Sequence, residues 1–291
     1  MIYKYTFLLS FLLHVSVLHA ELNDKLIGMT IPLYSYPTDT QVSIGNMWDA
    51  VADAAKFMPM VVVVGVNSSE DTKADFIDGI NKLHSSGATV LAYVATGLTV
   101  SEEDPKVPHD IAILKAEIDD FVNNFDIDGI FFDEALAFDE LANGEDMFNY
   151  YEEITAYAKS YEKVKKVMLN ISFVIKEDIV RSSSDDFVIF ENYISNWDVF
   201  LASQYEGVSF RRLHIIVHGD NNSSGENYMD SAVMQAYLKD SVDEKSLVNV
   251  YFTDDEFHHL PSFWYDEVAE IRKYNNILKS SYLPIIHYLL N

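Results

Sequence analysis

The feature that most constrains this sequence is a regular alternation of strand-like and helix-like segments along nearly its whole length. Short apolar runs, several of them rich in β-branched residues, each precede a longer stretch with helical character. Runs of this kind are typical of parallel strands that are buried on both faces. We identify eight of them, at residues 26–33, 60–66, 88–94, 129–133, 166–170, 187–191, 213–218 and 247–252.

This alternation predicts the α/β fold class and a parallel sheet with helical crossovers. Eight strands is the number that closes into a barrel. The alternative, a doubly wound open sheet, usually carries a Gly-rich phosphate loop after its first strand, whereas here residues 32–37 read Pro-Leu-Tyr-Ser-Tyr-Pro. We therefore predict a single-domain (β/α)8 TIM barrel, with helices at residues 48–57, 71–86, 109–125, 148–161 and 262–278. In the helix at residues 109–125 we expect Ile113, Ile118, Phe121 and Val122 to face inward.

The first twenty residues have the character of a targeting signal. Lys4 gives a weakly positive start, and an almost unbroken apolar run follows from Thr6 to Leu18. The run fits a signal-peptide core of ~7–15 residues and is shorter than the ~20 residues of a membrane span. We predict a signal peptide at residues 1–20, a barrel domain at residues 21–291 and secretion to the extracellular space. The alternative is an N-terminal membrane-anchoring or buried helix.

Composition excludes several classes of function. The chain has no cysteine, so neither disulfides nor thiol catalysis is available to it. Its formal net charge of −26 predicts repulsion of nucleic acid and anionic membranes and attraction of polycations. We predict no nucleic-acid partner and no membrane span in the mature chain. Solubility alone is the alternative explanation of the charge.

Polar and tyrosine residues recur where the predicted strands end. In a TIM barrel the carboxyl ends of the strands form one rim, and active sites lie there. The tyrosines at this rim could stack on sugar rings or pack in the core. We predict eight substrate-binding residues along the rim: Tyr34, Asn67, Tyr93, Asn170, Tyr193, His218, Thr253 and Asp254.

Two acids stand out because each directly follows an apolar strand: Asp133 and Glu191. Carboxylates beside buried strands usually have a partner or a chemical task. Cleavage of a glycosidic bond needs two carboxyl groups, so we predict catalytic roles for Asp133, Glu191 and the neighbouring Glu134. Because strand side chains alternate between faces, we expect Glu134 to face the mouth only if the chain bends there. The alternative is that these acids cap the following helices.

The sequence does not favour a metal site or any cofactor. His214 and His218 are four residues apart, which on a strand separates them by roughly 13 Å, too far to share an ion. We expect His214 to lie in the core and His218 to contact substrate.

Taken in order, several segments resemble the spherulin-4-like, or spherulation-specific, glycoside hydrolases. The resemblance covers residues 27–275, and its segments are residues 31–37, Gly87 with residues 91–94, 128–134, 169–170, 188–191, 253–255 and 260–264. It implies a (β/α)8 barrel that cleaves α-1,4-linked galactosamine or N-acetylgalactosamine polymers of extracellular matrix or biofilm. Such a polymer is cationic when partly deacetylated. In a retaining pathway, the resemblance implies Asp133 as nucleophile, Glu191 as acid/base and Glu134 as an acidic partner.

The chain departs from this family in several rim loops. Asn67 is followed by Ser68 and Ser69 rather than a Pro/Gly-rich loop, and Asn170 is followed by Ile171 rather than Pro-Gly-Thr. The residues after Tyr93 also lack the usual aromatic side chain. These departures keep two other hypotheses open: a non-catalytic cell-wall, coat or carbohydrate-binding barrel, and a hydrolase of a different glycan. Whether the reaction is retaining or inverting also stays open.

Overall fold

A computed structural model describes residue 22 and residues 25–98, 107–135, 141–142, 145–171, 174–255 and 257–290. The predicted signal peptide at residues 1–20 lies outside the described residues. The predicted barrel domain is therefore described over most of its length.

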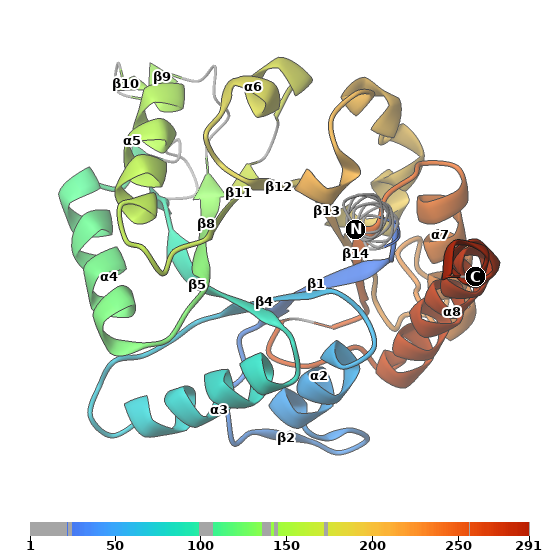
Figure 1. Cartoon of the computed structure of the whole chain (residues 1–291). Helices are drawn as coiled ribbons and strands as arrows, with labels where there is room; N and C mark the ends of the chain where they lie inside the picture. The colour runs from blue at the N-terminus through green and yellow to red at the C-terminus, as the bar shows by residue number, and fades with distance from the viewer. Residues whose placement is uncertain are drawn as a thin grey trace, which may run out of the picture.

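The eight predicted strands form a closed parallel barrel in the order β1-β14-β13-β12-β11-β8-β5-β4 (Figure 1). This confirms the predicted (β/α)8 fold. Three short antiparallel hairpins lie outside the barrel: β2 (Thr40–Gln41) with β3 (Gly45–Asn46), β6 (Gly97–Leu98) with β7 (Val107–Pro108), and β9 (Leu141–Ala142) with β10 (Glu145–Asp146). The barrel strands are β1 (Gly28–Leu33), β4 (Met60–Val64), β5 (Thr89–Ala95), β8 (Gly129–Ala135), β11 (Lys166–Ile171), β12 (Asp186–Tyr193), β13 (Leu213–His218) and β14 (Asn249–Thr253).

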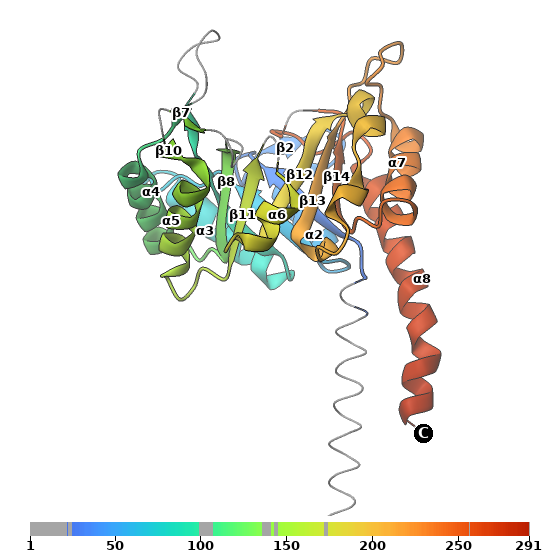
Figure 2. The ribbon, with the colours of Figure 1, turned by 90° about the horizontal axis from the view of Figure 1, so that it is seen from above.

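Helices surround the barrel, and most lie where the sequence predicts them (Figures 1 and 2). Two details differ. Ile113, expected to face inward, is 58% exposed. The connection after β12 is formed among the described residues by three 3-10 helices, η1 (Ile194–Val199), η2 (Ala202–Tyr205) and η3 (Phe210–Arg212). The α-helices are α2 (Met47–Ala55), α3 (Lys73–Ser85), α4 (Ile111–Asn124), α5 (Met147–Lys159), α6 (Lys176–Arg181), α7 (Ser231–Asp243) and α8 (Trp264–Leu290).

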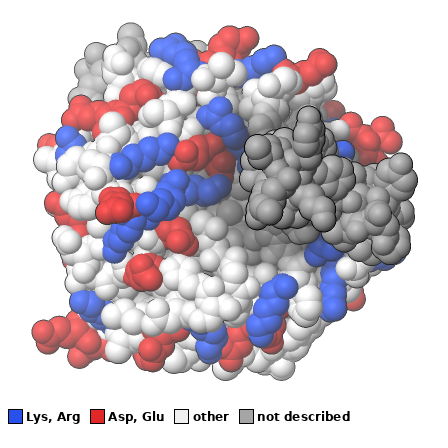
Figure 3. Space-filling model, in the orientation of Figure 1, with Lys and Arg blue, Asp and Glu red and all other residues white. Residues whose placement is uncertain are grey.

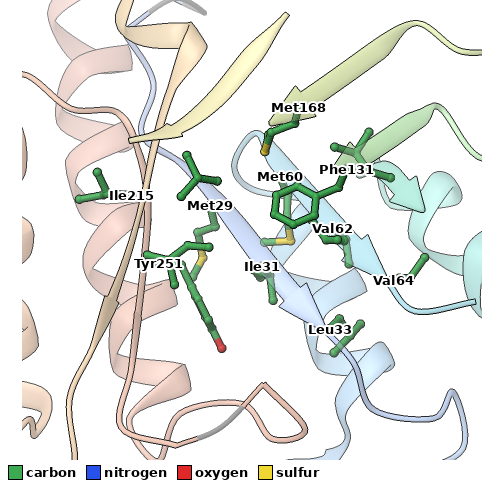
Figure 4. Close-up of a cluster of buried hydrophobic side chains, with 14 of the residues drawn as sticks. Met29, Ile31, Leu33, Met60, Val62, Val64, Phe131, Met168, Ile215 and Tyr251 are labelled. Carbon is green, nitrogen blue, oxygen red and sulfur yellow. The ribbon is translucent and has the colours of Figure 1, made fainter. Parts of the chain in front are cut away.

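The barrel interior is filled by apolar side chains from several strands (Figure 4). Met29, Ile31 and Val62 are essentially inaccessible to solvent, as are Phe131 and Tyr251. Burying one such aliphatic or aromatic side chain stabilises the fold by roughly 1.5–3 kcal/mol. The interior is therefore a packed core, and chemistry is confined to the rim.

Helix α8 runs beyond the predicted end at residue 278, to Leu290. In Figure 2 its C-terminal part extends past the barrel on the side of the amino ends of the strands, opposite the rim where β6–β7 lies. Within the described part of the chain, no helix combines the length and hydrophobicity needed to cross a membrane.

The barrel closes between β1 and β14 through a short parallel ladder. The two strands pair at only two positions, Gly28 with Asn249 and Met29 with Val250. Further along β14, the Phe252 N–H donates to Glu267 Oε1 of α8 at 3.0 Å. The Glu267 side chain is fully buried, and burial raises its pKa well above the ordinary value. Glu267, whose uncharged form is favoured by burial, therefore bonds to β14 beyond the two positions at which that strand pairs with β1.

This buried acid predicts a pH-dependent stability. Because the folded-state pKa of Glu267 is raised, its contribution is complete below the unfolded pKa and is lost as pH rises toward the folded value. We expect Glu267→Gln to be at least as stable as the wild type at pH 8, with a difference that shrinks toward pH 4. Glu267→Ala should cost about 2–4 kcal/mol at either pH, because it leaves a cavity and an unpaired Phe252 N–H. Urea denaturation at both pH values measures this; a glutamine variant less stable than wild type at pH 8 contradicts it.

Candidate active site

The two predicted catalytic acids meet at the rim through one asparagine. Asp133 lies on β8 and Glu191 on β12, and β11 with Asn170 lies between these strands. The Asn170 Nδ2 amide donates to Asp133 Oδ1 at 2.7 Å and also to Glu191 Oε2. Parallel strands end at one edge of the barrel, so three successive strands bring two carboxylates to a single amide group.

Asp133 is the more buried acid of the pair, and its protonation reflects this. Burial and the negative charge of Glu191 raise the pKa of Asp133 to about 6, against the opposing effect of three donors. Those donors are the Glu134 backbone N–H, the Asn170 amide and the Tyr93 hydroxyl. At neutral pH this buried carboxyl group is therefore mostly ionised, and it takes up a proton as the pH falls through about 6.

The chain bends at Glu134, as its predicted approach to the mouth requires. Glu134 has a φ of 54°, in the left-handed region that a residue with a side chain seldom adopts. Such a φ breaks the strict alternation of the strand. The Glu134 charge contributes to raising the pKa of Tyr93, after burial and the charge of Asp133. Glu134 is thus close enough to Tyr93, the residue that bonds to Asp133, to influence its hydroxyl electrostatically.

Five rings line the rim beside the acids and form what we call the aromatic arc: Tyr93, Tyr34, Phe257, His218 and Tyr193. Neighbouring ring centroids along it are 5.2, 5.7, 5.0 and 5.9 Å apart. At one end Tyr93 bonds to Asp133, and near the other His218 Nε2 lies 3.5 Å from Glu191 Oε1. Flat apolar rings beside an acid pair suit the apolar face of a sugar.

The sequence analysis missed Phe257. This residue lies beyond the end of β14, in a loop with no periodicity, so no strand-end signal marks it. Its carbonyl accepts the Tyr34 N–H at 3.1 Å, which fixes the loop against the end of β1. The structure thereby inserts a phenylalanine between two predicted rim residues, Tyr34 and His218.

Three predicted substrate-binding residues have bonds within their own loops rather than with the acid pair. The exposed Asn67 accepts the Ser69 N–H at 2.9 Å in a turn before α3. Thr253 is fully buried, and its hydroxyl donates to the Asp255 carbonyl at 2.9 Å. The Asp254 carboxylate accepts both the N–H and the hydroxyl of Ser262. Substrate contact by Asn67, Thr253 and Asp254 stays a prediction.

In the described part of the chain, no group of three histidine, aspartate or glutamate side chains is arranged to hold a metal ion. His214 is buried in the barrel, as expected, and its Nδ1 lies 2.5 Å from the Thr30 hydroxyl. The site consists of carboxylates, one amide and aromatic rings. Carboxylates are groups that can act as general acids and bases.

A barrel with a carboxylate pair at the carboxyl ends of its strands belongs to the class of TIM barrels used by many glycoside hydrolases. Residues 28–271 match the spherulation-specific family 4, and the chain belongs to that family. This confirms the resemblance identified in the sequence. Among curated proteins, no relative matches.

Solved structures support the same fold at low sequence identity. The glycoside hydrolase domain of PgaB from Bordetella bronchiseptica is 11% identical with a TM-score of 0.50, and the match covers 80% of this chain and 95% of that one. A family 5 glycoside hydrolase from Prevotella bryantii, solved with a xyloglucan oligosaccharide, is 9% identical with a TM-score of 0.51 and coverages of 88% and 98%. Both have the fold of this chain.

Proposed function

We propose that this protein is a glycoside hydrolase that cleaves a polysaccharide by a retaining mechanism at Asp133 and Glu191. The observation that carries the proposal is the shared Asn170 amide, which bonds to both carboxylates. Two oxygens bonded to one planar NH₂ group lie about 5 Å apart when each N–H···O bond has its usual length. Retaining enzymes place their carboxyl groups ~5–5.5 Å apart and inverting enzymes ~6.5–9.5 Å apart, so this spacing favours retention.

The roles follow from the surroundings of each acid. Asp133 accepts three hydrogen bonds, which favour its charged form against the effect of burial and suit a nucleophile. Glu191 lies nearer solvent, with its side chain 27% exposed beside His218, where a leaving group and then water could exchange protons with it. Asp133 would attack the anomeric carbon while Glu191 protonates the departing oxygen. Glu191 would then take a proton from water as water cleaves the glycosyl–enzyme bond.

For the substrate we propose an amino-sugar polymer of the α-1,4-galactosamine or N-acetylgalactosamine type. Membership of spherulation-specific family 4 and the net charge of −26 support this, because partial deacetylation makes such a polymer cationic. Many lysines and arginines gather on the face at the amino ends of the strands, opposite the rim (Figure 3). Some of the chain's lysines are held in ion pairs, as in the pair Lys159–Asp185. A polymer of this kind lies outside the cell, so the proposal includes export through residues 1–20.

The raised pKa of Asp133 predicts the acid side of the pH profile. The nucleophile must be ionised, and burial beside Glu191 raises the pKa of Asp133 to about 6. We expect kcat/KM to fall tenfold per pH unit as the pH drops below this value. Because the two carboxyl groups interact, the apparent pKa of this acid limb, the low-pH side of the profile, belongs to the pair as a unit. Initial rates between pH 4 and 8 measure it, and a rate that stays constant down to pH 4 contradicts the assignment.

The deciding experiment is release of reducing ends from a galactosamine-rich polysaccharide by the chain lacking residues 1–20. A panel of acetylated and deacetylated polymers, with xyloglucan as a neutral glycan, defines the substrate. Proton NMR of the first product should show retention at the anomeric carbon. Saturable binding to the polymer without new reducing ends would instead identify a carbohydrate-binding barrel.

A further inference from the structure

The residue that follows β5, Thr96, is bonded to the end of β8. Thr96 is fully buried, and both its N–H and its hydroxyl donate to the Asp133 carbonyl at 2.8 Å. The Thr96 carbonyl in turn accepts the His109 N–H at 2.8 Å, beside the β6–β7 hairpin. The backbone of Asp133 is therefore fixed by a buried threonine from the neighbouring strand.

The next residue, Gly97, touches the unusual turn at Glu134. A Cβ added at Gly97 would lie 2.5 Å from the Glu134 carbonyl oxygen and 3.3 Å from the Glu134 Cβ. The nearest atom is backbone, so a side chain at residue 97 requires the chain at Glu134 to move. Gly97 thus leaves the space in which Glu134 adopts its φ of 54°.

The turn at Glu134 matters because of where its N–H points. In this conformation the Glu134 backbone N–H donates to the carboxylate of Asp133. A left-handed backbone conformation costs a non-glycine residue of order 1–3 kcal/mol, and it persists only where the surrounding structure enforces it. Here the contacts from Thr96 and Gly97 are the surroundings that hold the conformation.

We propose that Thr96 and Gly97 are positioning residues that hold Asp133 and the left-handed Glu134 in their reactive geometry. Thr96 fixes the Asp133 carbonyl by two hydrogen bonds. Gly97, which has no side chain, leaves room for the Glu134 carbonyl. Together they direct the Glu134 N–H toward the Asp133 carboxylate. The catalytic meaning of this arrangement rests on the proposed function, whereas its effect on Asp133 ionisation does not.

The substitution Gly97→Ala tests the proposal. Moving Glu134 should weaken its N–H bond to Asp133 and raise the pKa of that carboxyl by about one pH unit. With the acid displaced, kcat should fall about 100-fold and KM should change less than about threefold. The matched control is Gly65→Ala, at the carboxyl end of β4, where an added Cβ meets nothing within 4 Å. That control should keep the wild-type pH profile.

Thr96 supplies a second, milder test. Thr96→Val removes the hydroxyl bond to Asp133 while preserving shape, and it should lower kcat about fivefold to tenfold with the acid limb moved to higher pH. Thr96→Ser keeps the hydroxyl, so the acid limb of its pH profile should lie at the wild-type pH. A purely structural role would lower the melting temperature of Thr96→Val without moving the limb, and that result overturns the proposal for Thr96.

Carbon-13 NMR titration of the Asp133 carboxyl, in wild type and variants, separates this inference from the proposed function. If the wild type cleaves no polysaccharide, the proposed function fails, and the titration still decides the role of Gly97. An Asp133 pKa that is the same in wild type and folded Gly97→Ala overturns the inference. Should Gly97→Ala fail to fold, the Thr96→Val and Thr96→Ser titrations decide in the same way.

Discussion

Asp133→Asn and Glu191→Gln should each lower kcat/KM by at least about 1,000-fold, because each removes one of the two groups that break the glycosidic bond. Both changes preserve shape and remove only the ability to ionise. Reducing-end release at pH 7 measures the loss. Matched controls are Asp53→Asn on α2 and Glu153→Gln on α5, whose side chains are 73% and 54% exposed on the outside of the barrel. Both controls should keep wild-type activity.

The same aspartate variant should gain stability while losing activity. Burial holds the folded pKa of Asp133 at about 6, above its ordinary value of 3.8. Its stabilising contribution is therefore complete below the unfolded pKa and is lost as pH rises through about 6. An uncharged asparagine removes a penalty of up to about 3 kcal/mol at pH 8. We expect Asp133→Asn to unfold at the same or a higher temperature than wild type at pH 8. A variant that loses both activity and stability would point to a structural role instead.

The sequence predicted the barrel well because its signals are repeated. Eight apolar runs in alternation with helices leave few topologies, and an error in one run does not change the count. The apolar pattern is a weaker guide to which side of a helix faces the barrel. Ile113 was expected to face inward from the apolar pattern of residues 109–125, but the helical phase places it on the exposed side. Hydrophobicity alone does not require burial.

At the site, sequence position predicted which residues reach the rim but not what they do there. Asp133, Asn170 and Glu191 end three neighbouring strands, so parallel pairing brings them together. The bond from one Asn170 amide to both acids depends on side-chain geometry that spacing does not encode. Thr253 and Asp254 also lie at a strand end, yet bonds in the following loop occupy them. Phe257 lies at the site because of the conformation of its loop, which no sequence pattern predicts.

Asn170→Ala should lower kcat/KM by about 100-fold or more, because it removes the one group that bonds to both acids. Without the amide, Asp133 loses a donor to its charged form and still faces Glu191, so its pKa should rise further above 6. The acid limb of the pH profile should therefore move to higher pH. Initial rates between pH 4 and 9 measure both effects.

Asn170→Asp tests the same role of the amide by adding a negative charge in its place. A third carboxylate at this point replaces a donor with a repelling acceptor, so we expect a larger loss than in Asn170→Ala. The difference should shrink at low pH, where the added acid is protonated and can donate again. If the alanine and aspartate variants instead share one unshifted pH profile, the amide merely fills space. The spacing of Asp133 and Glu191 would then be set by their strands, and the retaining assignment would lose its geometric support.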